Sequence, residues 1–174
     1  TLNPVLAQLA NLRLGDALFF QGRFAESAEV FREFLEQFPN SPDAPHAAYM
    51  RGLSFLRRMP DDIWLLPPAE SRETSDVESA YETLTGLIAG YPDSFYAMRA
   101  RLLLGQTLER KCRHHMYIAD YYGREKKPLG IVQRIEQAIA LESMERERGY
   151  LPQDYRCAET PRVLLRLGRA YYDA

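Results

Sequence analysis

Residues 14–39 read LGDALFFQGRFAESAEVFREFLEQFP, and this stretch decides the fold. Gly15 is small enough to let two helices approach each other closely, and Gly22 ends the first helix. An apolar stripe at helical spacing follows and stops at Pro39; it consists of Phe24, Ala28, Phe31, Leu35 and Phe38. The pattern predicts a pair of helices that cannot bury its own stripe and must stack on further copies.

This order of small, aromatic and helix-stopping residues is typical of a tetratricopeptide repeat. The same register returns around Gly52, around Ala119 and around Gly168. The sequence therefore predicts an all-α fold, a tetratricopeptide-repeat superhelix of antiparallel helix pairs in a single domain over residues 1–174. We expect repeats at 6–39, 44–92 and 95–148, and a partial repeat at 160–174.

Three features depart from a plain repeat. Residues 59–74 contain three prolines and the apolar run Ile63, Trp64, Leu65 and Leu66, which predicts a long ordered loop inserted in the second repeat. Residues 95–124 contain no proline and predict one overlong first helix for the third repeat. The apolar stripe of the final helix has no partner helix after it, so we expect more chain or a binding partner to cover it.

Composition limits the function classes. Lys and Arg number 22 and Asp and Glu 24, without a long basic block, which argues against a nucleic-acid partner. No apolar run approaches the roughly 20 residues that span a bilayer. The chain begins at Thr1, which suggests a trimmed protein and leaves the compartment open. Cys112 and Cys157 are too few for a disulfide framework and leave their redox state undecided.

Enzymatic and metal-binding functions find little support. Cys112 and His115 share a helix face beside His114, but zinc needs further ligands, and no recognisable motif places His46 or Cys157 near them. No phosphate-binding glycine loop, nucleophile elbow or His-Glu-x-x-His motif occurs. We therefore predict no catalytic residue, no metal and no cofactor.

The first helix of each pair lines the concave face of such a superhelix. An apolar face with few charges there suits an extended or helical peptide with aromatic anchors. The alternative is that some of these side chains only pack against the neighbouring repeat. The candidate peptide-binding residues are Leu12, Asp16, Phe19, Phe20, Tyr49, Met50, Leu53 and Leu56.

Three stretches carry a resemblance to a known family. They are AYMRGL at 48–53, the segment from SAY at 79–81 to YPDS at 91–94, and the segment from YIADYY at 117–122 to VQR at 132–134. In consistent order from about residue 9 to residue 172, the chain resembles the BamD (ComL) family, lipoproteins of the outer-membrane β-barrel assembly machinery.

The resemblance implies a non-enzymatic scaffold on the periplasmic face of the outer membrane. A lipid on the full-length precursor, absent from this chain, would hold it there. The implied partners are proteins: the barrel-forming assembly subunit, docked through the C-terminal repeats, other assembly lipoproteins, and unfolded barrel substrates received by the N-terminal repeats.

A second candidate surface, for a protein partner, consists of Tyr117, Tyr121, Tyr122 and Arg134. Tyrosine suits interfaces because its ring is buried while its hydroxyl keeps a partner. Tyr117 and Tyr121 share one helix face and Tyr122 points away, so one side is expected in the core. Arg134, matched to an arginine of the family, is expected in a structural ion pair or at the partner.

Two other functions stay open. One is an envelope tetratricopeptide adaptor that tethers or regulates a cell-wall enzyme. The other is a generic cytosolic adaptor, which the composition alone does not exclude. A full-length precursor sequence, or the partners recovered from native membranes, would separate these classes.

Overall fold

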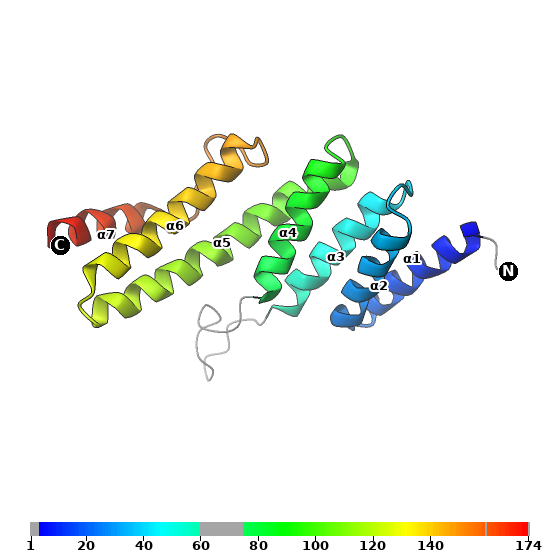
Figure 1. The fold of residues 1–174 in the computed structure, drawn as a ribbon, viewed down its shortest axis with the longest axis horizontal. Helices are drawn as coiled ribbons and strands as arrows, with labels where there is room; N and C mark the ends of the chain where they lie inside the picture. Colours follow the sequence, from blue (N-terminus) through cyan, green and yellow to red (C-terminus); the bar gives the residue numbers. More distant parts are fainter. Residues whose placement is uncertain (1–3, 60–74, 159, 174) are drawn as a thin grey trace. The chain divides into compact units, whose positions relative to one another are not determined.

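The computed structural model describes residues 4–59, 75–158 and 160–173. Within those ranges the chain forms helices and no strands, which confirms the predicted all-α fold. Residues 60–74 of the predicted insertion, with Ile63, Trp64, Leu65 and Leu66, lie outside the described residues. In chain order the helices are α1 (Pro4–Phe20), α2 (Phe24–Gln37), α3 (Ala44–Arg58), α4 (Ser75–Gly90), α5 (Phe95–Arg124), α6 (Pro128–Glu147) and α7 (Thr160–Asp173) (Figure 1).

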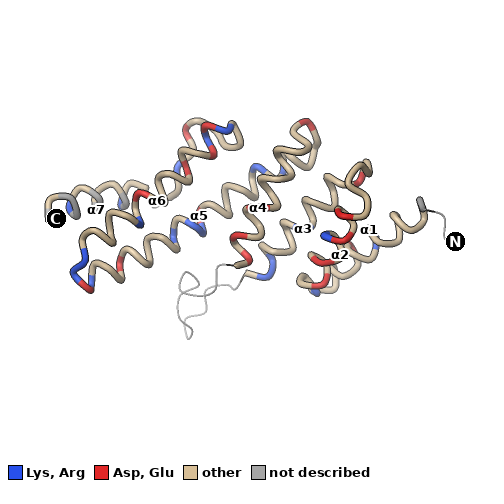
Figure 2. Tube along the Cα trace, viewed as in Figure 1, with Lys and Arg blue, Asp and Glu red and all other residues tan. Residues whose placement is uncertain are grey.

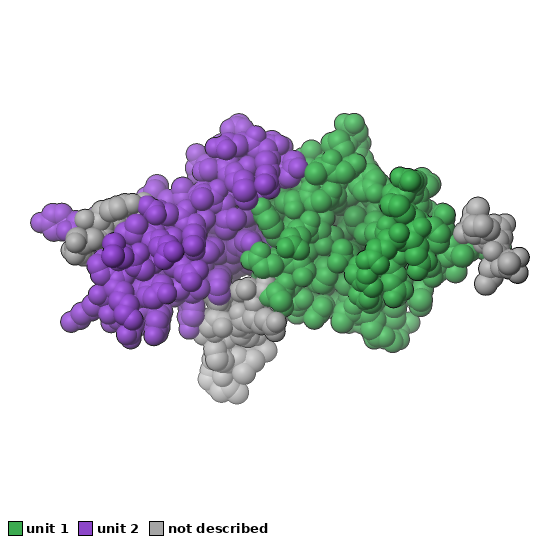
Figure 3. Space-filling view, viewed as in Figure 1, with its two compact units in different colours: residues 1–61, 73–104 green, residues 62–72, 105–174 purple. Residues whose placement is uncertain are grey.

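The chain divides into two compact units (Figure 3). Unit 1 comprises residues 1–61 and 73–104, and unit 2 comprises residues 62–72 and 105–174. Unit 1 therefore contains α1 to α4 and the beginning of α5, and unit 2 contains the rest of α5, α6 and α7. The single long helix predicted for 95–124 is confirmed, and it belongs to both units.

In unit 1 each helix packs against the next, from α1 to α4. The turn after α1 depends on Gly22, whose φ of 76° lies in the left-handed region that favours glycine. The Arg23 amide donates to the Leu18 carbonyl at 2.9 Å and the Gly22 amide to the Phe19 carbonyl at 3.0 Å, which is a Schellman cap. Gly22 thus ends the first helix, as predicted.

A seam of small residues joins the first three helices. The Ser27 hydroxyl of α2 donates to the Gly15 carbonyl of α1 at 3.0 Å, and the Ser54 hydroxyl of α3 reaches Ser27 Oγ at 3.3 Å. Ser27, Ser54 and Phe31 are each fully buried. A methyl group at Gly15 would lie 2.7 Å from the Phe31 ring, so glycine is required there by close approach of the two helices.

We predict that Gly15→Ala destabilises unit 1 by about 1–3 kcal/mol, because the buried Phe31 ring has no room to move away from the added methyl. Gly86→Ala in α4 is the matched control, since nothing lies within 4 Å of its methyl position. The control should stabilise the helix by about 1 kcal/mol. Thermal unfolding followed by circular dichroism measures both, and equal effects of the same sign would refute the packing argument.

In unit 2, α5 and α6 pack through a small apolar cluster of Met116, Ala119 and Ile135. The last helix, α7, packs against α6. Its outer face is open: Leu164 and Leu165 are more than half exposed and Tyr172 is 91% exposed. Among the described residues, the apolar side chains on this face of α7 are therefore accessible.

Candidate functional site

The first helices of unit 1 are α1, α3 and the beginning of α5, and a polar network connects them. His46 Nε2 lies 3.0 Å from Asp16 Oδ1, and His46 Nδ1 lies 3.1 Å from the Tyr96 hydroxyl. Asp16 also accepts from Arg13 at 3.3 Å. The Asp16 and His46 side chains are only 14% and 22% exposed, so the network fixes the spacing of three helices on the face predicted to bind peptide.

Aromatic rings extend this network. The His46 ring meets Phe31 and Tyr96 edge to face, at centroid distances of 6.2 and 5.3 Å. Tyr96 also lies 5.6 Å from Tyr49, and the Arg99 guanidinium sits 5.2 Å from the Tyr49 ring. Edge-to-face rings and a cation over a ring are both attractive. These contacts therefore connect α1, α3 and the beginning of α5 at the centre of this face.

Burial divides the eight predicted peptide-binding residues. Leu12, Tyr49 and Met50 are each less than 9% exposed and belong to the core. The burial of these three side chains favours the alternative in which they only pack inside the fold. Partly exposed are Asp16, Phe19, Leu53 and Leu56.

The eighth residue, Phe20, is 83% exposed at the end of α1. Its ring lies 5.8 Å from Phe19, and Phe19 lies 5.2 Å from Phe24 of α2. Such an exposed ring, in contact with a neighbouring ring, offers apolar area to a ligand at little cost in side-chain entropy. We call Asp16, Phe19, Phe20, Leu53 and Leu56 the open first-helix surface.

The residues of the second predicted surface, proposed for a protein partner, also differ in exposure. Tyr121 is 50% exposed, and Tyr117 is partly buried. Tyr122 packs over α6, since a methyl group at Gly130 would lie 2.7 Å from its ring. Arg134 donates to Gln137 at 3.2 Å, and within the described part of the chain it forms none of the ion pairs expected of it.

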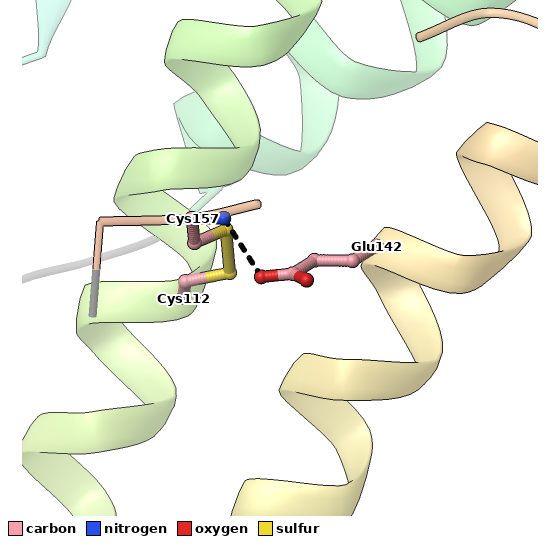
Figure 4. Close-up of side chains that lie close together, drawn as sticks. All are labelled: Cys112, Glu142 and Cys157. Atoms are coloured by element: carbon pink, nitrogen blue, oxygen red, sulfur yellow. Dashed lines mark hydrogen bonds between the residues drawn. A yellow bond between two sulfur atoms is a disulfide. The ribbon is translucent and has the colours of Figure 1, made fainter. Parts of the chain in front are cut away.

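A disulfide bond joins α5 to the connection between α6 and α7. Cys112 and Cys157 form a disulfide across 45 residues, with Cα atoms 6.6 Å apart (Figure 4). Glu142 of α6 points at the two sulfurs, and the three potential ligand atoms lie within 4.8 Å of one another. A disulfide sulfur is not a thiolate, so the oxidised cluster does not offer the anionic sulfur that zinc binds.

Glu142 is 2% exposed and organises this connection. Its Oε1 accepts from the Cys157 amide at 2.8 Å and from the Thr160 hydroxyl at the start of α7. Arg146 lies 3.8 Å from Oε2 and donates to the Tyr155 carbonyl at 2.9 Å. The buried carboxylate thus holds the beginning of α7 as well as the connection.

α5 supplies a second set of contacts. Glu109 accepts from the Ala158 amide at 2.7 Å, and the Tyr155 hydroxyl donates to the Gly105 carbonyl at 2.8 Å. Burial raises the pKa of the Tyr155 hydroxyl, and the charges of Glu109 and Glu142 raise it further, so the hydroxyl remains a donor. The connection between α6 and α7 is therefore a tightly bound segment.

Sequence reasoning missed the residues that build these clusters. From the sequence, His46 is only a possible metal ligand, the redox state of Cys157 is undecided, and neither Tyr96 nor Glu142 is singled out. The available signal for His46 and Tyr96 was their position on successive first helices, which lie side by side in this kind of fold. For Glu142 the signal was a carboxylate on the apolar side of a helix.

No helix in the described ranges is both long enough and apolar enough to cross a bilayer. Helix pairs joined by small-residue seams, with an open surface on their first helices, define a tetratricopeptide-type protein, a class that binds other polypeptides.

Comparison with known proteins identifies the family. The model of the YfiO family, described as outer membrane lipoprotein, matches residues 2–143, and the chain belongs to this family. Membership associates the chain with the outer membrane.

The Caulobacter vibrioides outer membrane protein assembly factor BamD is 24% identical over 160 residues, which are 92% of this chain and 46% of that protein. The Haemophilus influenzae outer membrane protein assembly factor BamD is 28% identical over 105 residues, 59% of this chain and 40% of that protein. The chain thus spans less than half the length of each of these relatives.

Proposed function

We propose that the chain is part of a non-enzymatic scaffold that assembles β-barrel proteins at the periplasmic face of the outer membrane. The family match over residues 2–143 carries this proposal, and the two relatives are named as assembly factors. In the full-length precursor a lipid anchor would hold the scaffold on the membrane. Its partners would be the barrel-forming subunit, other assembly lipoproteins and unfolded barrel segments.

The disulfide supports the proposed compartment. Disulfides persist in oxidising environments such as the periplasm and are rare in the cytosol. Cys112 and Cys157 are 1% and 2% exposed, so their bond is part of the folded core of unit 2. An oxidising compartment therefore suits this chain better than the cytosolic alternative does.

The proposed peptide site is the open first-helix surface of unit 1. Phe20 offers an exposed ring, and Leu53 and Leu56 add partly exposed apolar area. A peptide with an aromatic anchor could bury these side chains, and the network of Asp16, His46 and Tyr96 would keep the surface from reorganising. For a protein partner we propose the second surface, with Tyr117, Tyr121 and Arg134 as its members.

Co-purification from native membranes tests the scaffold role. The full-length lipidated protein, extracted in mild detergent, should bring the barrel-forming subunit with it. Recovery of a cell-wall enzyme without that subunit would instead support the adaptor that tethers or regulates such enzymes, and would overturn the proposal.

We predict that Phe20→Glu combined with Leu53→Glu abolishes peptide capture and leaves the unfolding temperature nearly unchanged. Both side chains retain solvent access, so the new carboxylates stay hydrated but oppose an apolar ligand. The probe is a synthetic peptide that copies the C-terminal strand of an outer membrane β-barrel protein, and fluorescence anisotropy measures its binding. Glu33→Gln, on an exposed position of α2, is the control that should bind normally. Undiminished binding by the double variant would exclude this surface.

A further inference from the structure

The turn between α5 and α6 has an unusual residue at its central position. The Lys127 amide donates to the Tyr122 carbonyl at 2.9 Å and the Lys126 amide to the Gly123 carbonyl at 3.2 Å, which is a Schellman cap. Its left-handed position is usually glycine, yet here it is Lys126, with φ of 54°. Lys126 is the one non-glycine residue with positive φ in the described chain. A lysine in this conformation is less stable than glycine would be.

Charge gathers at the same turn. Arg124, Lys126 and Lys127 are all exposed, and none of them forms an ion pair with another described residue. Figure 2 shows basic residues gathered where α5 meets α6. In the sequence, Glu125 is the one acidic residue of this turn. Leu129, in the first turn of α6, is 75% exposed. We call Arg124, Lys126, Lys127 and Leu129 the basic tip.

Helix electrostatics explain only part of this arrangement. The carbonyl end of α5 favours a cation in the last turn, which accounts for Arg124. It does not account for Lys126, because glycine would close the same cap without strain. Backbone strain that the fold does not need points to a use for the side chain.

We propose that the basic tip docks on an anionic phospholipid surface. Long, unpaired cations at the end of a helical hairpin reach phosphate headgroups, while an exposed leucine beside them enters the boundary of the acyl chains. Each cation near such a surface adds attraction, and salt weakens it. The chain belongs to a family of outer membrane lipoproteins, so a lipid surface lies within reach of the protein. This docking is independent of peptide or subunit binding.

The test compares vesicles of phosphatidylcholine with vesicles that also contain phosphatidylglycerol, using the chain without its lipid anchor. We expect co-sedimentation with the anionic vesicles alone, and weaker binding at higher salt. The variant Lys126→Gly with Lys127→Ser places glycine at the left-handed position and serine at the N-cap of α6, both of which favour the turn. It should unfold about 2–4 °C higher than the wild type. Its partition onto anionic vesicles should fall about 25-fold, or fivefold for each cation removed.

The matched control is Arg23→Ser with Arg32→Ser, which removes the same net charge. Arg23 and Arg32 pair with Glu26 and Glu29 on the outside of unit 1. The control should bind anionic vesicles as the wild type does. Equal binding to both kinds of vesicle, no binding to either, or equal loss in both variants would each overturn the proposal.

Discussion

Replacing Cys112 and Cys157 together with alanine is expected to lower the free energy of unfolding by about 4 kcal/mol. The disulfide closes a loop across 45 residues, and its removal returns the entropy of that loop to the unfolded chain. Alanine fits both buried positions without introducing an unpaired polar group. Chemical denaturation of the whole chain, followed by circular dichroism, measures the change in the free energy of unfolding.

Reductant supplies the control for this prediction. The wild-type protein in excess dithiothreitol should approach the stability of the double alanine variant, and the variant should not respond to reductant at all. Protease should cut the reduced protein first within residues 149–158, because the disulfide is one of the contacts that hold this segment on α5. A variant as stable as the oxidised protein would show that the bond adds nothing to the fold.

Glu142→Ala is expected to cost about 3 kcal/mol. The substitution leaves the Cys157 amide and the Thr160 hydroxyl without their acceptor and deprives Arg146 of its buried partner. Glu142→Gln retains an acceptor oxygen of the same size, so it should cost only about 1 kcal/mol. Denaturant titration at neutral pH measures both variants.

Glu147→Ala is the control on the same helix, and its exposed side chain predicts a change within about 0.5 kcal/mol. A double-mutant cycle that combines Glu142→Ala with the double cysteine-to-alanine variant gives a further test. Once the disulfide is absent, Glu142→Ala should cost less, because both hold the same segment. Strictly additive effects would mean that the carboxylate and the disulfide act on separate parts of unit 2.

The helices were predictable because their signals are local. Gly22 and Pro39 end helices where the sequence places them, and the uninterrupted stretch 95–124 forms one helix. Gly15 marks a close helix contact for the same reason: only a residue without a side chain allows the approach of Phe31.

The site was less predictable because its details are not local. Tyr49 and Met50 follow the helical period of a surface helix, but burial depends on which neighbour covers that face. Cys112 and Cys157 meet only because the connection after α6 turns back onto α5. It is held there by contacts such as the hydrogen bond from Tyr155 to Gly105, which no sequence pattern predicts. The repeat boundaries and the peptide site stay predictions.

The disulfide has a further consequence for how the molecule opens. Its two sulfurs lie on either side of α6 in the sequence, so the oxidised bond keeps the connection after α6 tethered to α5 even when the helices around it open. Under oxidising conditions this segment therefore opens and recloses as a covalently closed loop and does not separate from α5.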